Sequence, residues 1–218
     1  MALKLVIGNK NYSSWSLRPW LALKVKGLAF EEEVIPLYED GAKARILEVS
    51  PAGKVPVLLD AGTLVWDSLA ILEYLADRQP ALRLWPAEPE ARARARCIAA
   101  EMHSGFGALR SRMSMNLRKD LSGRVAVEGD LAADIARVQQ IWRDTREEFG
   151  AGGPFLFGGF TAADAMYAPV VTRFKTYGVA VDAVSAEYMQ AILDLPAMQE
   201  WYADAAAETW VIPAAEID

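Results

Sequence analysis

The 218-residue chain has very few of the residues that build metal centres and disulfides: it contains one cysteine, Cys97, and one histidine, His103. A lone cysteine excludes an intramolecular disulfide and any paired-cysteine redox or zinc motif. A lone histidine without a partner cluster supports neither a metal site nor a histidine-based triad. We therefore expect no metal cofactor, a buried and inert Cys97, and a packed or hydrogen-bonded His103.

Excess positive charge and long apolar runs are also missing. The chain has 23 Lys and Arg against 29 Asp and Glu, which gives a net charge of −6. An acidic protein of this kind is not expected to bind nucleic acid. No apolar run reaches the roughly 18 residues that a membrane-spanning helix needs, so we expect no membrane association. Residues 1–7 resemble a buried strand rather than a signal peptide, which favours a cytoplasmic location.

The residues that are present predict a folded protein, because 53% are hydrophobic and 24% are charged. The first 78 residues alternate strand-like and helix-like patterns. Strands are predicted at 3–8, 30–36, 55–60 and 63–66, and helices at 16–26, 41–49 and 68–78. The order β-α-β-α-β-β-α indicates an α/β domain over residues 1–78.

The sequence pattern changes at residues 79–89, which contain three prolines and are typical of a linker. Beyond it only helical patterns occur, so residues 90–218 are predicted to form an all-α domain. The predicted helices are 90–118, 130–149, 162–177, 185–193 and 196–208. Thr161 and Asp164 have the spacing of a capping box, with Asp in place of the usual Glu.

Two short features suit the binding of a small, charged peptide. Val55-Pro56 ends a loop and opens a strand, as a cis-proline often does. It would turn the Val55 backbone outward, where an extended peptide can pair with it. Asp67-Ser68 begins a helix and offers a carboxylate, a hydroxyl and free N–H groups, which suit the amine and carboxylate of an amino acid.

These landmarks together resemble the cytosolic glutathione transferase superfamily over the whole chain. The matching segments are YSSWS at 12–16, SPAGKVPVL at 50–58, WDSLAILEYL at 66–75 and GGFTAAD at 158–164. Each is weak alone, but their order and intervals are specific. The serine-type classes zeta, tau and theta are most similar, and zeta above all. The resemblance implies a thioredoxin-like first domain, and a helical second domain that forms the second-substrate pocket.

The resemblance makes Ser13 the first candidate for the catalytic residue, because it falls where the serine-type classes place their active serine. Its hydroxyl would donate to the glutathione sulfur, with help from the positive end of the following helix. Ser14 is the second candidate, and an ordinary capping role is the alternative for Ser13. Tyr12 also carries a donor, although its position suits a pocket wall better.

The remaining glutathione-binding residues are also implied by the resemblance. Lys54 would meet the glycyl carboxylate, Val55 would pair through its backbone, and Pro56 would shape the site. Asp67 would hold the γ-glutamyl ammonium and Ser68 its carboxylate. A solvated loop lysine and an ordinary helix cap are the alternatives for these side chains.

One residue departs from the zeta pattern, because Trp15 stands where that class has cysteine. The bulky indole argues against zeta-type cis-trans isomerase activity and suggests a pocket wall. Candidates for the second-substrate pocket are Tyr12, Trp15, Phe106, Met113, Met115 and Trp210, each with helical core packing as its alternative.

The expected function is therefore that of a glutathione transferase, with glutathione as co-substrate and no metal. The thiolate would attack a small hydrophobic or carboxylated electrophile. A glutathione-dependent isomerase of the maleylacetoacetate type is the alternative enzyme, and a non-catalytic glutathione-binding module is the alternative outside enzymes. A glutaredoxin-like thiol reductase is disfavoured because no cysteine lies near residue 13. The resemblance also implies a homodimer.

Overall fold

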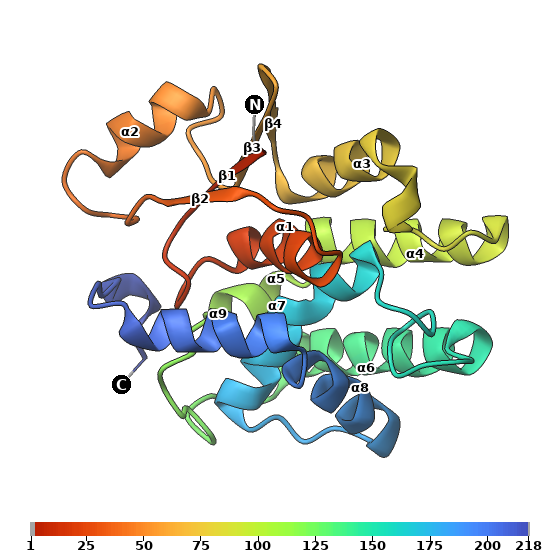
Figure 1. Cartoon of the computed structure of the whole chain (residues 1–218). Helices are drawn as coiled ribbons and strands as arrows, with labels where there is room; N and C mark the ends of the chain where they lie inside the picture. The colour runs from red at the N-terminus through yellow and green to blue at the C-terminus, as the bar shows by residue number, and fades with distance from the viewer. Residues whose placement is uncertain (1–2, 218) are drawn as a thin grey trace.

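The first part of the chain folds around a four-stranded mixed sheet. The computed structural model describes residues 3–217, so the outermost positions of the two expected domains, 1, 2 and 218, lie outside the described residues. The strands are β1 (Lys4–Ile7), β2 (Glu31–Val34), β3 (Val57–Asp60) and β4 (Thr63–Trp66). Their order is β2-β1-β3-β4; β1 and β2 are parallel, while β3 is antiparallel to both β1 and β4 (Figure 1).

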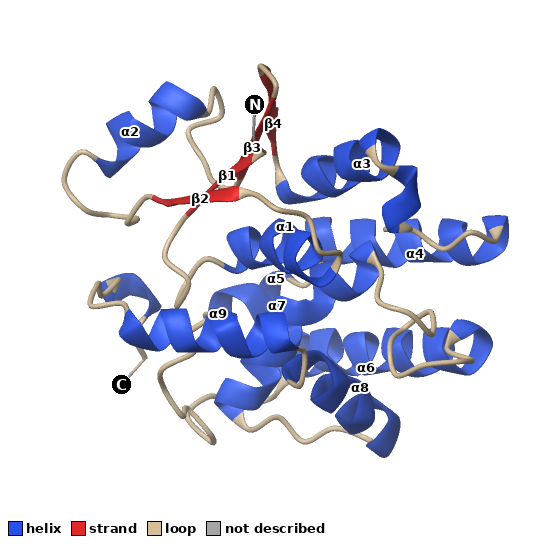
Figure 2. Ribbon diagram, in the orientation of Figure 1, coloured by secondary structure: helices blue, strands red, loops and turns tan. Residues whose placement is uncertain are grey.

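Helices accompany the sheet in the first part of the chain and make up the second part, as Figure 2 shows by colour. Those of the first part are α1 (Ser14–Val25), α2 (Ala42–Val49) and α3 (Ser68–Arg78). The second part contains α4 (Pro89–Ser104), α5 (Gly107–Arg112), α6 (Gly129–Phe149), α7 (Ala162–Tyr177), α8 (Ala183–Leu193) and α9 (Pro196–Ala207). The expectation of an α/β domain followed by an all-α domain is confirmed.

Helix α1 joins the two parts of the molecule. It packs against α3 on the sheet side and against α7 and α9 on the helical side. Trp20 of α1 and Trp201 of α9 are both fully buried, with ring centroids 4.9 Å apart. Because α1 is fixed from both sides, the residues at its N-terminus are held against both parts of the protein.

The structure corrects three sequence-based expectations. Helix α1 begins at Ser14, two residues earlier than predicted. The long helix predicted at 90–118 is broken after Ser104, where Gly105 is extended and Phe106 is left-handed with φ = 57°. An extended Gly105 followed by a left-handed residue cannot continue a helix, so the chain turns before α5. Cys97 is exposed rather than buried, because it lies on the outer face of α4.

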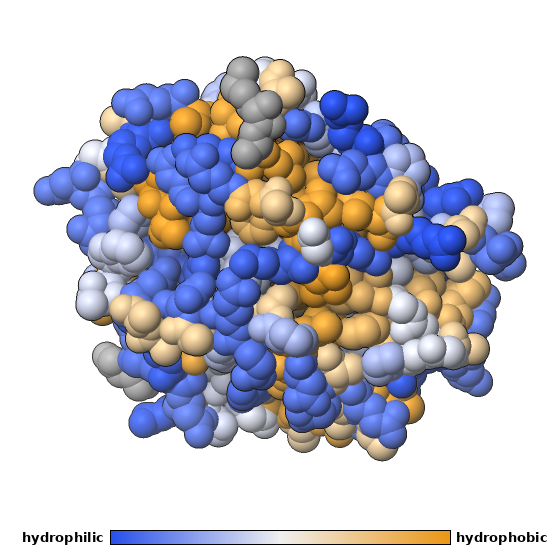
Figure 3. Space-filling model, in the orientation of Figure 1, coloured by the Kyte–Doolittle hydropathy of each residue, from blue (hydrophilic) through white to orange (hydrophobic). Residues whose placement is uncertain are grey.

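Apolar side chains are unevenly distributed over the surface. On the face shown in Figure 3, apolar side chains gather over the sheet and between α1 and α4, whereas α2 and α9 present mainly polar ones. Trp66 at the end of β4 is 45% exposed and is among the largest apolar side chains that reach solvent. None of the helices within residues 3–217 combines the length and apolar character that crossing a bilayer requires.

Candidate active site

A cavity of about 610 Å³ opens where three parts of the chain meet that are far apart in sequence. Residues 12–15, at the start of α1, form one wall. A second wall comes from residues between 37 and 46, which include part of α2, and from residues 53–55 before β3. Ile212, Ala214 and Ala215 of the C-terminal segment form the third. The size suits a tripeptide-sized ligand with room for a small second molecule.

Two serine hydroxyls line this cavity at the positive end of α1. The Ser13 hydroxyl donates to Ser16 Oγ at 2.7 Å, and Ser16 Oγ also accepts the N–H of Gly8 at 3.1 Å. Ser14 Oγ instead accepts from Nη2 of Arg173, on α7, at 3.2 Å. The cavity therefore has two hydroxyls at one helix end, held by different partners.

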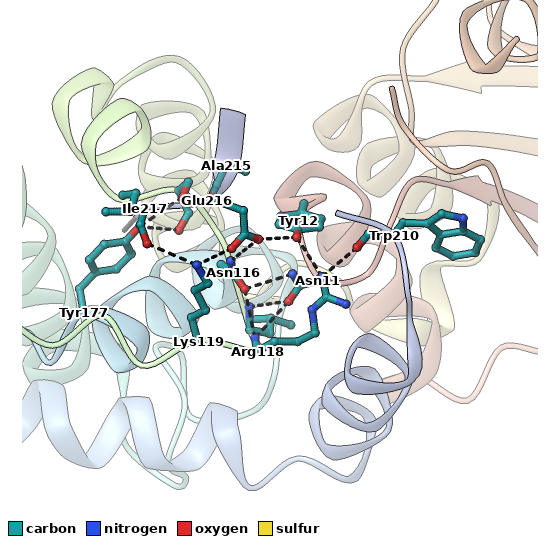
Figure 4. Close-up of polar contacts among 12 residues, drawn as sticks. Asn11, Tyr12, Asn116, Arg118, Lys119, Tyr177, Trp210, Ala215, Glu216 and Ile217 are labelled. Atoms are coloured by element: carbon teal, nitrogen blue, oxygen red, sulfur yellow. Dashed lines mark hydrogen bonds and ion pairs between the residues drawn. The ribbon is translucent and has the colours of Figure 1, made fainter. Parts of the chain in front are cut away.

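Tyr12 also lines the cavity, but its hydroxyl is already engaged. It donates to Glu216 Oε1 at 2.5 Å and accepts from Nη2 of Arg118 at 2.9 Å. Figure 4 shows the Tyr12 and Glu216 side chains pointing toward each other, with Asn116 donating to the same carboxylate oxygen at 2.9 Å. Because a phenol has a single proton, Tyr12 has none left for a ligand and acts here as a wall.

The same network fixes the C-terminal wall of the cavity (Figure 4). Nη2 of Arg118 donates to the Trp210 carbonyl at 2.8 Å, and Lys119 pairs with Glu216 Oε2 at 2.6 Å. The Ala215 carbonyl accepts from the Ser114 hydroxyl at 2.8 Å. Trp210 thus contributes its backbone to this network and is not among the residues that line the cavity, whereas Ala215 is.

The loop before β3 has the form expected of a peptide-binding edge. Lys54 is exposed and Val55 half-buried, and both line the cavity. The Val55–Pro56 peptide bond is cis, and Pro56 is buried behind it. Lys43 of α2, which the sequence did not single out, donates to the Gly53 carbonyl at 2.8 Å. Gly53 has φ = 61°, a left-handed backbone conformation that favours glycine at this position.

Asp67 caps α3 in an unusual backbone conformation. Its Oδ1 accepts from the N–H groups of Leu69 at 2.9 Å and Ala70 at 3.2 Å. Its φ is 77°, a region that residues with a side chain rarely adopt and that typically costs about 1–3 kcal/mol. Oδ2 lies 3.2 Å from Nε2 of His103 on α4. Backbone strain of this kind is concentrated at functional sites. It therefore suggests that Asp67 has a role beyond capping α3.

Ser68 and Trp15 are connected through a buried arginine. Nη1 of Arg18 donates to Ser68 Oγ at 3.4 Å, and its guanidinium lies 4.1 Å from the centroid of the Trp15 ring. Arg110 lies 5.2 Å from the same ring, and His103 meets it edge-on at 5.3 Å. Trp15 lines the cavity, whereas Asp67 and Ser68 are not among its lining residues; Arg18 contacts both the indole and Ser68.

Three candidates for the second-substrate pocket lie in the hydrophobic core instead. Phe106, Met113 and Met115 are buried and are not among the cavity-lining residues. The break between α4 and α5 turns this segment inward, and the Met113 carbonyl accepts from Nε of Arg173 at 2.8 Å. Ile212 and Ala214, which the sequence did not single out, line the cavity instead.

Arg18, Arg173 and His103 surround the site, but sequence patterns did not point to them as site residues. Arg18 and Arg173 are 1% and 6% exposed. Burial lowers the pKa of Arg18 to about 9 and that of Arg173 to about 10, so both remain charged at neutral pH. The sequence did not point to Arg18 and Arg173 because an isolated arginine in a helix is usually exposed. Only the packing of α1 against α7 brings Arg173 into contact with Ser14 at the cavity wall.

Two family models match the chain in the order of its two parts. The model described as glutathione S-transferase, N-terminal domain, matches residues 12–78, and that described as glutathione S-transferase, C-terminal domain, matches residues 89–204. The second match alone spans more than half of the chain.

Individual relatives agree with these models. The chain is 31% identical over 190 residues to the maleylacetoacetate isomerase of Pseudomonas aeruginosa, which covers 83% of this chain and 85% of that protein. A probable maleylacetoacetate isomerase of Caenorhabditis elegans is 38% identical over 94 residues, and there the match spans only 44% of the relative. A glutathione transferase homolog from Burkholderia, solved with bound glutathione, has a TM-score of 0.71 at 24% identity, covering 94% of this chain and 98% of that one.

Proposed function

Because this chain belongs to the glutathione S-transferase family, we propose that it binds glutathione in the 610 Å³ cavity and activates its thiol. The resulting thiolate attacks a small electrophile bound beside it. The observation that carries this proposal is the pair of serine hydroxyls at the N-terminus of α1, facing a cavity whose opposite wall holds Lys54 and Val55.

Each end of the peptide has a matching group. Lys54 pairs with the glycyl carboxylate, and the Val55 backbone receives the extended cysteinyl unit as an added strand would. Asp67 and Ser68 do not line the cavity itself, so the γ-glutamyl end extends past Trp15 to the start of α3. There Asp67 binds the ammonium, while Ser68 and the helix N-terminus bind the neighbouring carboxylate. The exposed Lys54 on the cavity wall and the strained Asp67 at the start of α3 support this placement.

Activation needs only the release of one proton. The thiol loses its proton to water, and a serine hydroxyl donates a hydrogen bond to the thiolate that remains. The positive end of α1 adds to this preference for the anion. In a conjugation the sulfur then forms a bond to an electrophilic carbon, and the leaving group departs with its electron pair. Ile212, Ala214 and Tyr12 supply an apolar wall for that electrophile.

The test of this function is the pKa of the bound glutathione thiol, measured by ultraviolet thiolate absorbance across pH. One charge-assisted hydrogen bond and a helix end lower a thiol pKa by roughly two units. We expect that shift in the wild type. In a variant with both Ser13→Ala and Ser14→Ala we expect the part due to the hydrogen bond to be lost and only the smaller contribution of the helix end to remain. Tyr12→Phe is the matched control, and it should leave the thiol pKa unchanged because its hydroxyl is engaged by Glu216 and Arg118.

Calorimetry on the same proteins separates binding from activation. A wild type that does not bind glutathione contradicts the proposed function outright. Binding with an unshifted thiol pKa leaves a glutathione-binding module without activation, the non-catalytic alternative.

A glutathione-dependent isomerase is the second candidate, and one observation favours it. Arg18 and Arg110 flank the Trp15 ring at the edge of the cavity, and guanidinium groups suit the carboxylates of a maleylacetoacetate-type substrate. There the thiolate adds to the cis double bond, the new single bond rotates, and the thiolate leaves with its electron pair. Trp15, in place of the cysteine of the zeta pattern, argues against it. Product analysis on maleylacetoacetate distinguishes the trans isomer from a stable conjugate.

The cellular location, the oligomeric state and the physiological role are proposed from the family resemblance. A cytoplasmic homodimer with a role in detoxification is typical of such enzymes. The exposed Trp66 and Leu47, at 45% and 53%, give the sheet-containing part apolar surface that an association of two copies would cover.

A further inference from the structure

The two serines at the start of α1 are not equivalent, and the difference comes from their hydrogen-bond partners. Ser13 donates its only hydroxyl proton to Ser16 Oγ at 2.7 Å. Ser14 Oγ faces Nη2 of Arg173 at 3.2 Å. A guanidinium is a donor without an acceptor site, so Ser14 must be the acceptor in this contact. Its own proton therefore remains available, and Ser14 lines the cavity.

Arg173 is held in a fixed position by α7 and by the segment after α5. Its Nε donates to the Met113 carbonyl at 2.8 Å and its Nη1 to the Pro169 carbonyl at 3.2 Å. With Nη2 on Ser14, all three nitrogens are engaged, so Arg173 has little freedom to reach a ligand directly. Its contact with the cavity wall is the Ser14 hydroxyl, and its positive charge also attracts an anion in the cavity through space.

The charge of Arg173 is not neutralised by a nearby carboxylate. Among the described residues, neither Arg173 nor Arg18 forms an ion pair with an acidic side chain. The other charged or titratable groups acting on Arg173 are Tyr177 on its own helix, Arg110 on α5 and Arg18 on α1, and both arginines repel it. Asp67, at the start of α3, is the acidic side chain that acts on Arg18. A buried cation without a counter-ion favours an anion placed beside it.

We propose that Ser14 donates the hydrogen bond that stabilises the glutathione thiolate, and that Arg173 is the positioning residue that orients and polarises its hydroxyl. Ser13 then has a structural role, tying the start of α1 to Ser16. This rests on the proposed function of the cavity. A hydroxyl that accepts from a cation becomes a stronger donor, because hydrogen bonds in a chain polarise one another. The thiol proton leaves to water, and no further reactant is needed.

A double-mutant cycle on the pKa of bound glutathione tests this assignment. Ser14→Ala is expected to raise the thiol pKa by about one unit, a tenfold change in the ionisation constant, and Ser13→Ala by clearly less. Arg173→Lys should raise it by several tenths in the wild-type background, because an ammonium does not reproduce the guanidinium geometry. The same substitution should add almost nothing to Ser14→Ala, since the two residues act through one contact.

Thr176→Val is the matched control on α7. It removes a buried hydrogen bond to the Asn116 carbonyl without changing charge, so it should lower thermal stability and leave the thiol pKa unchanged. An Arg173→Lys shift that persists in full without the Ser14 hydroxyl overturns the positioning role. A larger shift in Ser13→Ala than in Ser14→Ala overturns the whole assignment, and it does so even if Arg173→Lys fails to fold. Calorimetric binding of glutathione to each variant shows separately whether the proposed function holds.

Discussion

Replacing Asp67 with asparagine is expected to weaken glutathione binding roughly thirty-fold, as measured by calorimetry at pH 7.5. A hydrogen bond between charged groups contributes about 2 kcal/mol, and that free energy corresponds to a factor of about thirty in the dissociation constant. Asparagine keeps an oxygen for the N–H groups of Leu69 and Ala70. The variant therefore loses the negative charge offered to the γ-glutamyl ammonium, and little of the helix cap.

Asp60→Asn is the matched control for this experiment. It removes the same charge from β3, where the carboxylate accepts from the Tyr74 hydroxyl at 2.9 Å and does not cap the N-terminus of α3. Its glutathione affinity should stay within twofold of the wild type. If Asp67→Asn binds glutathione as tightly as Asp60→Asn, the γ-glutamyl end does not lie at the start of α3.

Replacing Asp164 with alanine is expected to lower the free energy of unfolding by about 4 kcal/mol. Asp164 is fully buried, and its carboxylate accepts from the N–H of Leu156 at 3.1 Å and the N–H of Thr161 at 2.7 Å. The Thr161 hydroxyl also donates to it, at 2.8 Å. Each buried donor left without a partner costs about 1–3 kcal/mol. Urea denaturation followed by circular dichroism measures the loss.

The pKa of Asp164 decides the pH of that measurement, and a partly exposed helix cap provides its control. Burial raises the pKa of Asp164 to about 6, although its hydrogen-bond donors act in the opposite direction, so the experiment belongs at pH 7.5, where the carboxylate is charged. Asp182→Ala removes the comparable cap of α8, whose carboxylate accepts from Ser185 N at 2.8 Å but is partly exposed. It should cost about 1 kcal/mol. Equal losses at the two positions would show that burial adds nothing at Asp164.

The sequence was most informative where local chemistry decides structure. The alternation of strand and helix patterns, the proline-rich segment at 79–89 and the Thr161–Asp164 spacing depend on nearby residues, and they led to the correct fold class. The loop that contains Lys54 and Val55, and the start of α3 at Asp67, were found in the same way. Each is a short segment whose residue types are constrained by its own backbone.

The sequence was least informative where distant segments meet. Met113 and Met115 lie in a helical pattern that fitted a pocket wall equally well, and only the turn at Gly105 and Phe106 places them in the core. Ile212 and Ala214 belong to a C-terminal segment without a strong pattern, and the contacts of Glu216 with Tyr12 and Lys119 hold that segment at the cavity.

The sequence by itself therefore determined the family resemblance, the two kinds of domain and the candidate residues at the starts of α1 and α3. The tertiary structure alone decided which hydroxyl faces a cation and which is engaged elsewhere. The two serines are adjacent in sequence and equal in residue type, so no pattern could separate them. Their difference comes from Arg173, 159 residues away along the chain, and a contact over that separation exists only once α7 has packed against α1.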